Sequence, residues 1–150
     1  MINATLWFII KDDKILLAMK KRWFGAWLYN GVWWKQEKWE TIKQTMIREA
    51  KEEIWINIED LKQVWILNFY FDENSDWNQK VHVFKILDYS WEPTESEEMK
   101  PYWFDIDNLP FDKMWEDDKI WFKDFLDWKN FEYIFYFSED GKLWKREKLS

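Results

Sequence analysis

The sequence predicts an α/β protein in which a mixed β-sheet lies between helices, an α/β/α sandwich. Three observations support this fold class. Segments rich in β-prone residues occur in pairs, two amphipathic helical segments interrupt them, and the length of 150 residues suits one hydrophobic core. We therefore expect residues 1–150 to form a single domain.

The first predicted element is a β-hairpin. Residues 5–10 and 15–19 are apolar and β-prone, and the polar residues 11–14 between them suit a turn. The basic cluster Lys20-Lys21-Arg22 follows, and it is either a solvated strand end or a contact for phosphates. We interpret residues 24–38 as a loop.

Residues 41–54 have the pattern of an amphipathic helix. Thr41 followed by Gln44 fits a capping box at the helix start. Apolar residues then recur every four positions and provide a face for the core, at Ile42, Met46, Ala50 and Ile54.

Three glutamates in this helix indicate chemistry. Glu49, Glu52 and Glu53 are spaced i, i+3 and i+4, so they project from one side, beside the apolar face. Like charges at this spacing repel each other, whereas Arg48 and Glu52 can pair across one turn. The cluster is either a solvated helix face or a site for a hard divalent cation, Mg²⁺ or Mn²⁺.

The second half of the chain predicts two more hairpins, a strand and a helix. Residues 64–71 and 81–87 pair as one hairpin, and residues 131–137 and 143–149 pair around the turn Asp140-Gly141. Between them, residues 99–106 form a strand, and an amphipathic helix begins near residues 115–118. Acidic residues suit a helix N-terminus, which is a structural explanation for Asp117 and Asp118.

Composition limits the classes of partner. A net charge of −7 argues against binding to a nucleic-acid backbone, although it allows a small phosphorylated substrate because bound metal inverts the local charge. The apolar run near the start is too short for a signal or a membrane span, so we expect no membrane partner and a cytoplasmic location.

Tryptophan and glycine are present in abnormal numbers. The chain has 15 Trp and 3 Gly, where ordinary usage would give about ten glycines. We hypothesise that the source organism reads UGA as Gly and that the printed sequence reads it as Trp. The positions that favour Gly are Trp23, Trp27, Trp33, Trp34, Trp39, Trp55, Trp65 and Trp91.

The charged residues around the first helix resemble the Nudix box. Glu40 is followed, after seven residues, by Arg48-Glu49-Ala50-Lys51-Glu52-Glu53 and then by apolar Ile56. The family pattern is Gly, five residues, Glu, seven residues, Arg-Glu-apolar-x-Glu-Glu-x-Gly-apolar. Every charged position matches, whereas the two glycine positions hold Trp34 and Trp55. The resemblance implies the Nudix fold and metal-assisted hydrolysis of a nucleotide.

Segments outside the box resemble one branch of this family. The branch contains the oxidised purine nucleoside triphosphate hydrolases, which remove 8-oxo-dGTP and 2-hydroxy-dATP. The matching segments are residues 20–31, Val81–Phe84, residues 95–104 and residues 109–118, where Glu116 replaces a usual Pro.

The resemblance implies a role for each group of residues. Glu49, Glu52 and Glu53 would bind Mg²⁺ or Mn²⁺ with Glu98 as an additional carboxylate, Arg48 would orient them, and Glu40 would support the loop. Trp115 would stack on the purine, while Asn30, Asp117 and Asp118 would read its edge. The other expected substrate contacts are Thr5, Lys20, Phe24, Trp33, Trp34 and Phe69.

We therefore expect a monomeric Nudix diphosphatase that acts on small nucleotides and sanitises the nucleotide pool. Two adjacent buried acids would titrate as a coupled pair, so one of them can stay protonated and donate to the base. Two alternatives remain open. The substrate could be another nucleotide derivative, or the chain could bind nucleotides without turnover if Trp33, Trp34 and Trp55 are genuine and obstruct the phosphate loop.

Overall fold

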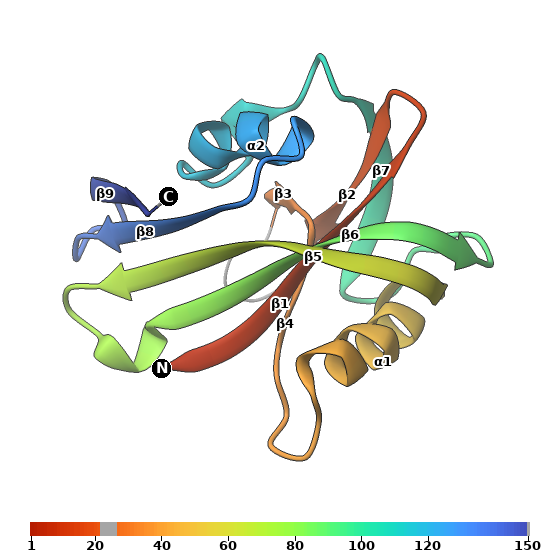
Figure 1. Cartoon of the computed structure of the whole chain (residues 1–150), viewed down its shortest axis with the longest axis horizontal. Coiled ribbons are helices and arrows are strands. Elements are labelled where there is room, and N and C mark those ends of the chain that lie inside the picture. Colours follow the sequence, from red (N-terminus) through yellow and green to blue (C-terminus); the bar gives the residue numbers. More distant parts are fainter. Residues whose placement is uncertain (22–26, 150) are drawn as a thin grey trace.

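The computed structural model describes residues 1–21 and 27–149 (Figure 1). Within these residues, nine strands form one sheet in the order β3-β2-β1-β6-β5-β8-β9, with β4 added beside β1 and β7 beside β2. The elements are β1 (Ile2–Lys11), β2 (Lys14–Lys20), β3 (Tyr29–Asn30), β4 (Val32–Lys35), α1 (Ile42–Ile54), β5 (Asn57–Phe71), β6 (Gln79–Ser90), β7 (Met99–Asp105), α2 (Asp118–Leu126), β8 (Phe131–Phe137) and β9 (Leu143–Leu149), with single 3₁₀ turns η1 (Ser75–Trp77) and η2 (Phe111–Lys113).

The sheet is mixed, as predicted. The hairpins β1–β2, β5–β6 and β8–β9 are antiparallel, and all three were expected from their turn residues. Two parallel pairings join these hairpins, β1 with β6 and β5 with β8. In each parallel pair the two strands run in the same direction, so segments that are distant in the sequence end at the same edge of the sheet.

The helices cover opposite faces of the sheet, which confirms the predicted layers (Figure 1). Strand β1 contributes to both cores because successive side chains of a strand point to opposite faces. Leu6 and Phe8 pack with the aromatic side chains of α2, whereas Trp7 and Ile9 pack with the apolar face of α1. Neither helix of the described chain has the length and apolar character that a membrane crossing requires.

Helix α1 begins at the predicted capping box. The Thr41 hydroxyl accepts a hydrogen bond from Gln44 N at 3.1 Å, and the Gln44 side chain accepts one from Thr41 N at 2.8 Å. These bonds satisfy backbone donors that the first helical turn leaves without a partner. Met46, Ala50 and Ile54 are fully buried, as their spacing predicts.

Two segments differ from the sequence prediction. The predicted loop at residues 24–38 contains the short strands β3 and β4, and β4 pairs with β1 through Thr5 and Trp34. Strand β5 also starts earlier than expected, because β6 is long enough to pair with residues from Asn57 onward through several register shifts. Both additions supply hydrogen bonds between strands that lie far apart in the sequence.

Tryptophans occupy most of the left-handed backbone positions. Five non-glycine residues of the described chain have positive φ, and four of them are Trp27, Trp55, Trp91 and Trp128, with φ between 60° and 70°. This conformation costs an L-residue about 1–2 kcal/mol and is routine for Gly. The geometry supports the recoding hypothesis at positions 27, 55 and 91 and adds Trp128 to it.

Trp128 fits the hypothesis because it follows the end of α2. Its N–H donates to the carbonyl of Phe125 at 3.2 Å, and Lys129 N donates to Asp124 O at 3.1 Å, a pattern that ends helices with a left-handed Gly. Positive φ does not occur at Trp33, Trp34, Trp39 or Trp65, so the backbone there does not require Gly. Trp23 lies outside the described residues.

The substitution Trp55→Gly is expected to increase the free energy of unfolding by about 1 kcal/mol, because it relieves a left-handed conformation. Trp55 is 63% exposed and has φ of 61°, and the packing that the substitution removes is its stacking on the exposed ring of Trp91 at 5.8 Å. Urea denaturation followed by circular dichroism measures the effect. Trp144→Gly is the control, because Trp144 is 55% exposed in the extended strand β9. That change should destabilise the fold, and equal effects of the two substitutions would contradict the prediction.

Candidate active site

Arg48 joins the loop before α1 to the glutamates of the helix. Its guanidinium donates to both carboxylate oxygens of Glu40, the bond from Nη2 being 3.1 Å long. It also donates to Glu49 and, at 3.2 Å, to Glu52. The Thr45 hydroxyl donates to Glu40 at 2.8 Å, and hydrogen bonding from Arg48 lowers the pKa of Glu40. Glu40 therefore anchors the loop, and Arg48 orients the carboxylates.

Glu49 and Glu53 are buried, with 1% and 7% of their surface exposed. The sequence predicted that all three glutamates lie beside the buried face of the helix. This was wrong for Glu49 and Glu53, because they belong to the face of α1 that is buried. Burial raises the pKa of Glu49 to about 7 against the opposing effect of Arg48. Burial also raises the pKa of Glu53, and the neighbouring carboxylates Glu98 and Glu49 raise it further.

The donor set fits a divalent cation. Within the described residues, the buried oxygens Oε2 of Glu49 and Oε2 of Glu98 have no hydrogen-bond partner. Such oxygens are costly to bury unless a proton or a cation compensates them. Oxygen-only donors suit a hard ion such as Mg²⁺. Glu49, Glu53 and Glu98 would hold it.

The carboxylates are not already gathered around one point. Among the residues that the structure describes, no group of three or more His, Cys, Asp or Glu side chains has the arrangement of a metal cluster. Glu52 is 57% exposed at its side chain and engages Arg48. Glu52 would therefore have to turn away from Arg48 to join a metal that the other glutamates hold.

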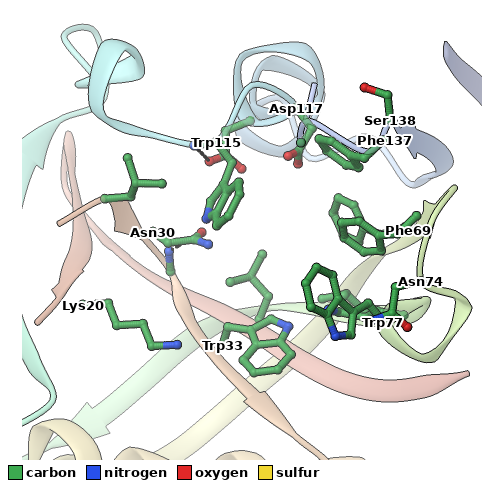
Figure 2. Close-up of a pocket in the computed structure, with 18 of the residues that line it drawn as sticks. Lys20, Asn30, Trp33, Phe69, Asn74, Trp77, Trp115, Asp117, Phe137 and Ser138 are labelled. Atoms are coloured by element: carbon green, nitrogen blue, oxygen red, sulfur yellow. Dashed lines mark hydrogen bonds between the residues drawn. The ribbon is translucent and has the colours of Figure 1, made fainter. Parts of the chain in front are cut away.

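A cavity of about 510 Å³ lies on the α2 side of the sheet (Figure 2), and the glutamates of α1 are not among the residues that line it. It contains most of the side chains predicted to contact substrate, namely Lys20, Asn30, Trp33, Phe69, Trp115, Asp117 and Asp118. Its volume is in the range of small-molecule sites. The structure thus brings together residues from β2, β3, β4, β5 and the start of α2.

Lys20 marks the end of the cavity that faces the glutamates. Burial lowers its pKa, and the charges of Glu98 and Glu53 oppose that effect, which places the ammonium group near both carboxylates. Its Nζ lies 6.0 Å from the centre of the Trp33 ring. The neighbouring Lys21 instead donates to Glu95 and to Ser96 O, so it anchors the segment before β7. Lys20 is therefore available to a phosphate group.

Asp117 and Asp118 form a buried pair at the wall of the cavity. They are 4% and 2% exposed. Asp117 accepts a bond from Trp121 Nε1 at 3.0 Å, and Asp118 accepts one from Trp115 N at 3.1 Å. Burial raises the pKa of Asp117 to about 6, and burial together with the charge of Asp117 raises that of Asp118 well above its usual value. Both shifts favour the protonated form of these carboxyl groups, which can donate a hydrogen bond.

Both acids lie at the N-terminus of α2, the position that the structural explanation gave them, but Asp117 does not cap the helix through its side chain. It occupies the N-cap position of α2 with helical backbone angles, and its side chain makes no capping hydrogen bond. Its carboxylate turns inward to the indole of Trp121 instead. Asp117 and Asp118 therefore lie in the buried wall of the cavity.

Two of the predicted contacts, Thr5 and Trp34, are not at the cavity wall. Thr5 is fully buried, and its hydroxyl donates to Trp34 O at 3.4 Å in the sheet. Neither Thr5 nor Trp34 is among the residues that line the cavity. Phe24 falls outside the described residues.

Several lining residues were missed by the sequence analysis. Phe71 was within reach, because it follows Phe69 at the two-residue period of a strand. Phe137 and residues 138–141 reach the cavity because β8 pairs in parallel with β5, which no local pattern reveals. The turn between β5 and β6 contributes Glu73, Asn74 and Trp77, and the start of β6 contributes Gln79.

Comparison with known proteins identifies a family. A model described as NUDIX domain matches residues 3–125. The chain is 41% identical over 137 residues to a Danio rerio protein named oxidized purine nucleoside triphosphate hydrolase, covering 91% of this chain and 86% of that protein. A Mus musculus protein of the same name is 38% identical over 139 residues, covering 93% and 88%.

Solved structures show the same fold. The mMutator MutT protein from Bacillus halodurans superposes with a TM-score of 0.86 at 24% identity, covering 99% of this chain and 97% of that one. A MutT NUDIX hydrolase from Burkholderia pseudomallei superposes with a TM-score of 0.66 at 24% identity, covering 73% and 86%. The mixed sheet between two helices is therefore the arrangement that these proteins share with the chain.

Glu49→Gln is expected to abolish stabilisation by divalent metal. In the unsubstituted protein, saturating Mg²⁺ or Mn²⁺ should increase the free energy of unfolding by about 1–3 kcal/mol, because the cation binds the folded state only. Thermal unfolding with and without metal measures this difference. Glu92→Gln, at an exposed loop position, is the matched control and should retain the full effect. An undiminished metal effect in Glu49→Gln would contradict the assignment.

Asp118→Asn is expected to flatten the dependence of stability on pH. The folded-state pKa of Asp118 is raised above its ordinary value of 3.8. Between the unfolded and the folded pKa, the folded chain therefore binds more protons than the unfolded chain. Stability is then fully present below the unfolded pKa and is lost as pH rises through the folded pKa. Between about pH 4 and 8 the unsubstituted protein should lose at least about 1 kcal/mol more than the variant. Metal-free urea denaturation at each pH tests this, and parallel pH curves would contradict it.

Proposed function

The chain belongs to the Nudix family, and from that premise we propose that it hydrolyses oxidised purine nucleoside triphosphates to the monophosphate and pyrophosphate. Relatives that share 38–41% identity over most of the chain carry the name of this activity. The substrates that we propose are 8-oxo-dGTP and 2-hydroxy-dATP, and their removal would sanitise the nucleotide pool.

The observation that carries the proposal is the buried pair Asp117–Asp118 in the same cavity as Trp115 and Asn30. A purine edge that enters this cavity meets groups able to donate and to accept hydrogen bonds. Leaving such buried groups unpaired is costly, so a base with the wrong donor pattern is rejected. A pair that shares one proton could present either a donor or an acceptor to the base, so purines with different donor patterns would bind.

The rest of the site supports hydrolysis of a triphosphate. Asn30 and the acid pair hold the base, while Lys20 at the other end would contact a phosphate. Glu49, Glu53 and Glu98, with Glu52 as a further candidate, would hold Mg²⁺, which neutralises phosphate oxygens and lowers the pKa of a bound water when it is present. A glutamate of raised pKa is suited to accept a proton from the attacking water. Arg48 keeps Glu49 and Glu52 oriented through its bonds to the loop residue Glu40.

One observation favours a second candidate, nucleotide binding without turnover. The indole of Trp33 lines the cavity beside Lys20, where a phosphate would pass. If this indole blocks the phosphate, the nucleotide would bind through its base alone. Turnover by protein that carries Trp at positions 33, 34 and 55 would exclude this candidate.

A substrate panel with pyrophosphate detection tests the proposed activity. We expect 8-oxo-dGTP and 2-hydroxy-dATP to be hydrolysed faster than the unoxidised triphosphates dGTP and dATP. We also expect them to be hydrolysed faster than derivatives of nucleoside diphosphates. Glu53→Gln should reduce kcat by about two orders of magnitude or more, because it removes a carboxylate that would hold Mg²⁺ and that could accept a proton from the attacking water. Release of inorganic phosphate in place of pyrophosphate, or preference for an unrelated nucleotide, would contradict the proposal.

Asp118→Asn separates base recognition from chemistry in the same assay. The amide cannot share a proton as the acid pair does, so activity on one oxidised purine should fall at least about tenfold relative to the other. Asp112→Asn, at an exposed position in η2, is the matched control and should leave the ratio unchanged. An unchanged substrate profile in Asp118→Asn would count against base reading by this pair.

A further inference from the structure

The cavity extends beyond the residues that would read the base. Its far end, which we call the distal lobe, is lined by Glu73, Asn74 and Trp77 from the turn between β5 and β6 and by Ser138, Glu139 and Asp140 from the turn between β8 and β9. Figure 2 shows Trp77 and Asn74 on one side of the cavity, with Phe69 and Phe137 nearby and Lys20 at the opposite end. None of the lobe residues has a role in the proposed hydrolysis.

The charges at the two ends of the cavity are opposite. Among the described residues that line it, the single cation is Lys20, beside the glutamates of α1. The distal lobe instead contributes the carboxylates Glu73, Glu139 and Asp140. A substrate with its phosphates at Lys20 would therefore direct the far side of its base toward a negative environment.

Two of these carboxylates are available to a ligand. Asp140 is engaged, because it accepts bonds from the Ser138 hydroxyl and from Lys142 N, and its second oxygen lies 3.9 Å from the Lys142 ammonium. Glu73 and Glu139 take part in no ion pair within the described residues. Their charges are not compensated by neighbours.

Trp77 supplies an aromatic surface held by its turn. Asn78 accepts a bond from Phe71 N at 2.8 Å, Trp77 N donates to Asn74 O at 3.0 Å, and the Trp77 ring meets the Phe71 ring edge to face at 6.0 Å. The indole is 50% exposed. Its backbone is not left-handed, so the conformation at this position does not favour Gly as it does at Trp55.

An exposed indole and uncompensated carboxylates that line the same cavity form a combination that suits organic cations. The ring face attracts an ammonium group through its quadrupole, and the carboxylates add charge attraction. A neutral or anionic group gains neither contribution. Resting on the proposed function, we propose that the distal lobe is a subsite for a positively charged substituent on the purine base, of the alkylammonium class.

Matched nucleotide pairs test this subsite. The probes are N6-(6-aminohexyl)-dATP and 8-[(6-aminohexyl)amino]-dATP, each compared with its N-acetylated form, which has the same linker without the charge. For at least one attachment point, the ammonium form should have a kcat/KM about three- to tenfold higher than the acetylated form. The ratio should fall toward one as salt is raised, because exposed charges are screened.

Variants assign the preference to the lobe. Trp77→Gly and the double change Glu73→Gln with Glu139→Gln should each bring the ratio close to one. Glu92→Gln is the matched control for charge and should preserve it. A ratio of one for both attachment points in the unsubstituted protein would overturn the inference, as would a ratio that both lobe variants leave intact.

The same probes separate this inference from the proposed function. Dissociation constants from isothermal titration calorimetry report the ammonium preference without turnover. Absence of hydrolysis of 8-oxo-dGTP and 2-hydroxy-dATP would refute the proposed function alone if the ammonium preference in binding persists. Hydrolysis of both substrates without any ammonium preference would refute the subsite alone.

Discussion

Burial of carboxylate charge between α1 and the sheet is the constraint on which the site depends. Glu49 and Glu53 are held against the sheet by the same turns that bury Met46, Ala50 and Ile54. Their charge is only partly compensated by protein, since Arg48 donates hydrogen bonds to Glu49 and Glu52 but, among the described residues, to neither Glu53 nor Glu98. A fold that pays such a desolvation cost gains from it only when a cation or a proton arrives.

The buried acids of α1 and those at the start of α2 serve different purposes. At α1 the acids lie beside Lys20, where oxygen donors and a cation suit a phosphate and its metal. At α2, Asp117 accepts a hydrogen bond from Trp121 and Asp118 accepts one from Trp115, which fixes the orientation of the pair. With the orientation fixed, the protonation state of the pair is what could change between substrates. One sheet carries both groups, and its parallel pairings of β1 with β6 and of β5 with β8 join its hairpins.

Local features of the fold were predictable from the sequence because local chemistry determines them. The capping box at Thr41, the turn at Asp140-Gly141 and the three hairpins all depend on residues close together in the chain. The burial of Glu49 and Glu53 was not predictable, because a charge run has the pattern of a solvated face until the sheet covers it. The parallel pairing of β5 with β8 and the contribution of Phe137 to the cavity depend on long-range contacts that periodicity does not encode.

The most direct test of the account is the location of bound metal. Crystals grown with Mn²⁺ and a nucleoside monophosphate should give an anomalous difference peak within coordination distance of Glu49, Glu53 and Glu98, with the base beside Trp115 and Asp118. The Glu53→Gln protein treated in the same way should lose the peak. A peak away from these glutamates, or none in crystals of the unsubstituted protein with nucleotide bound, would contradict the claim that the buried carboxylates exist to hold a catalytic cation.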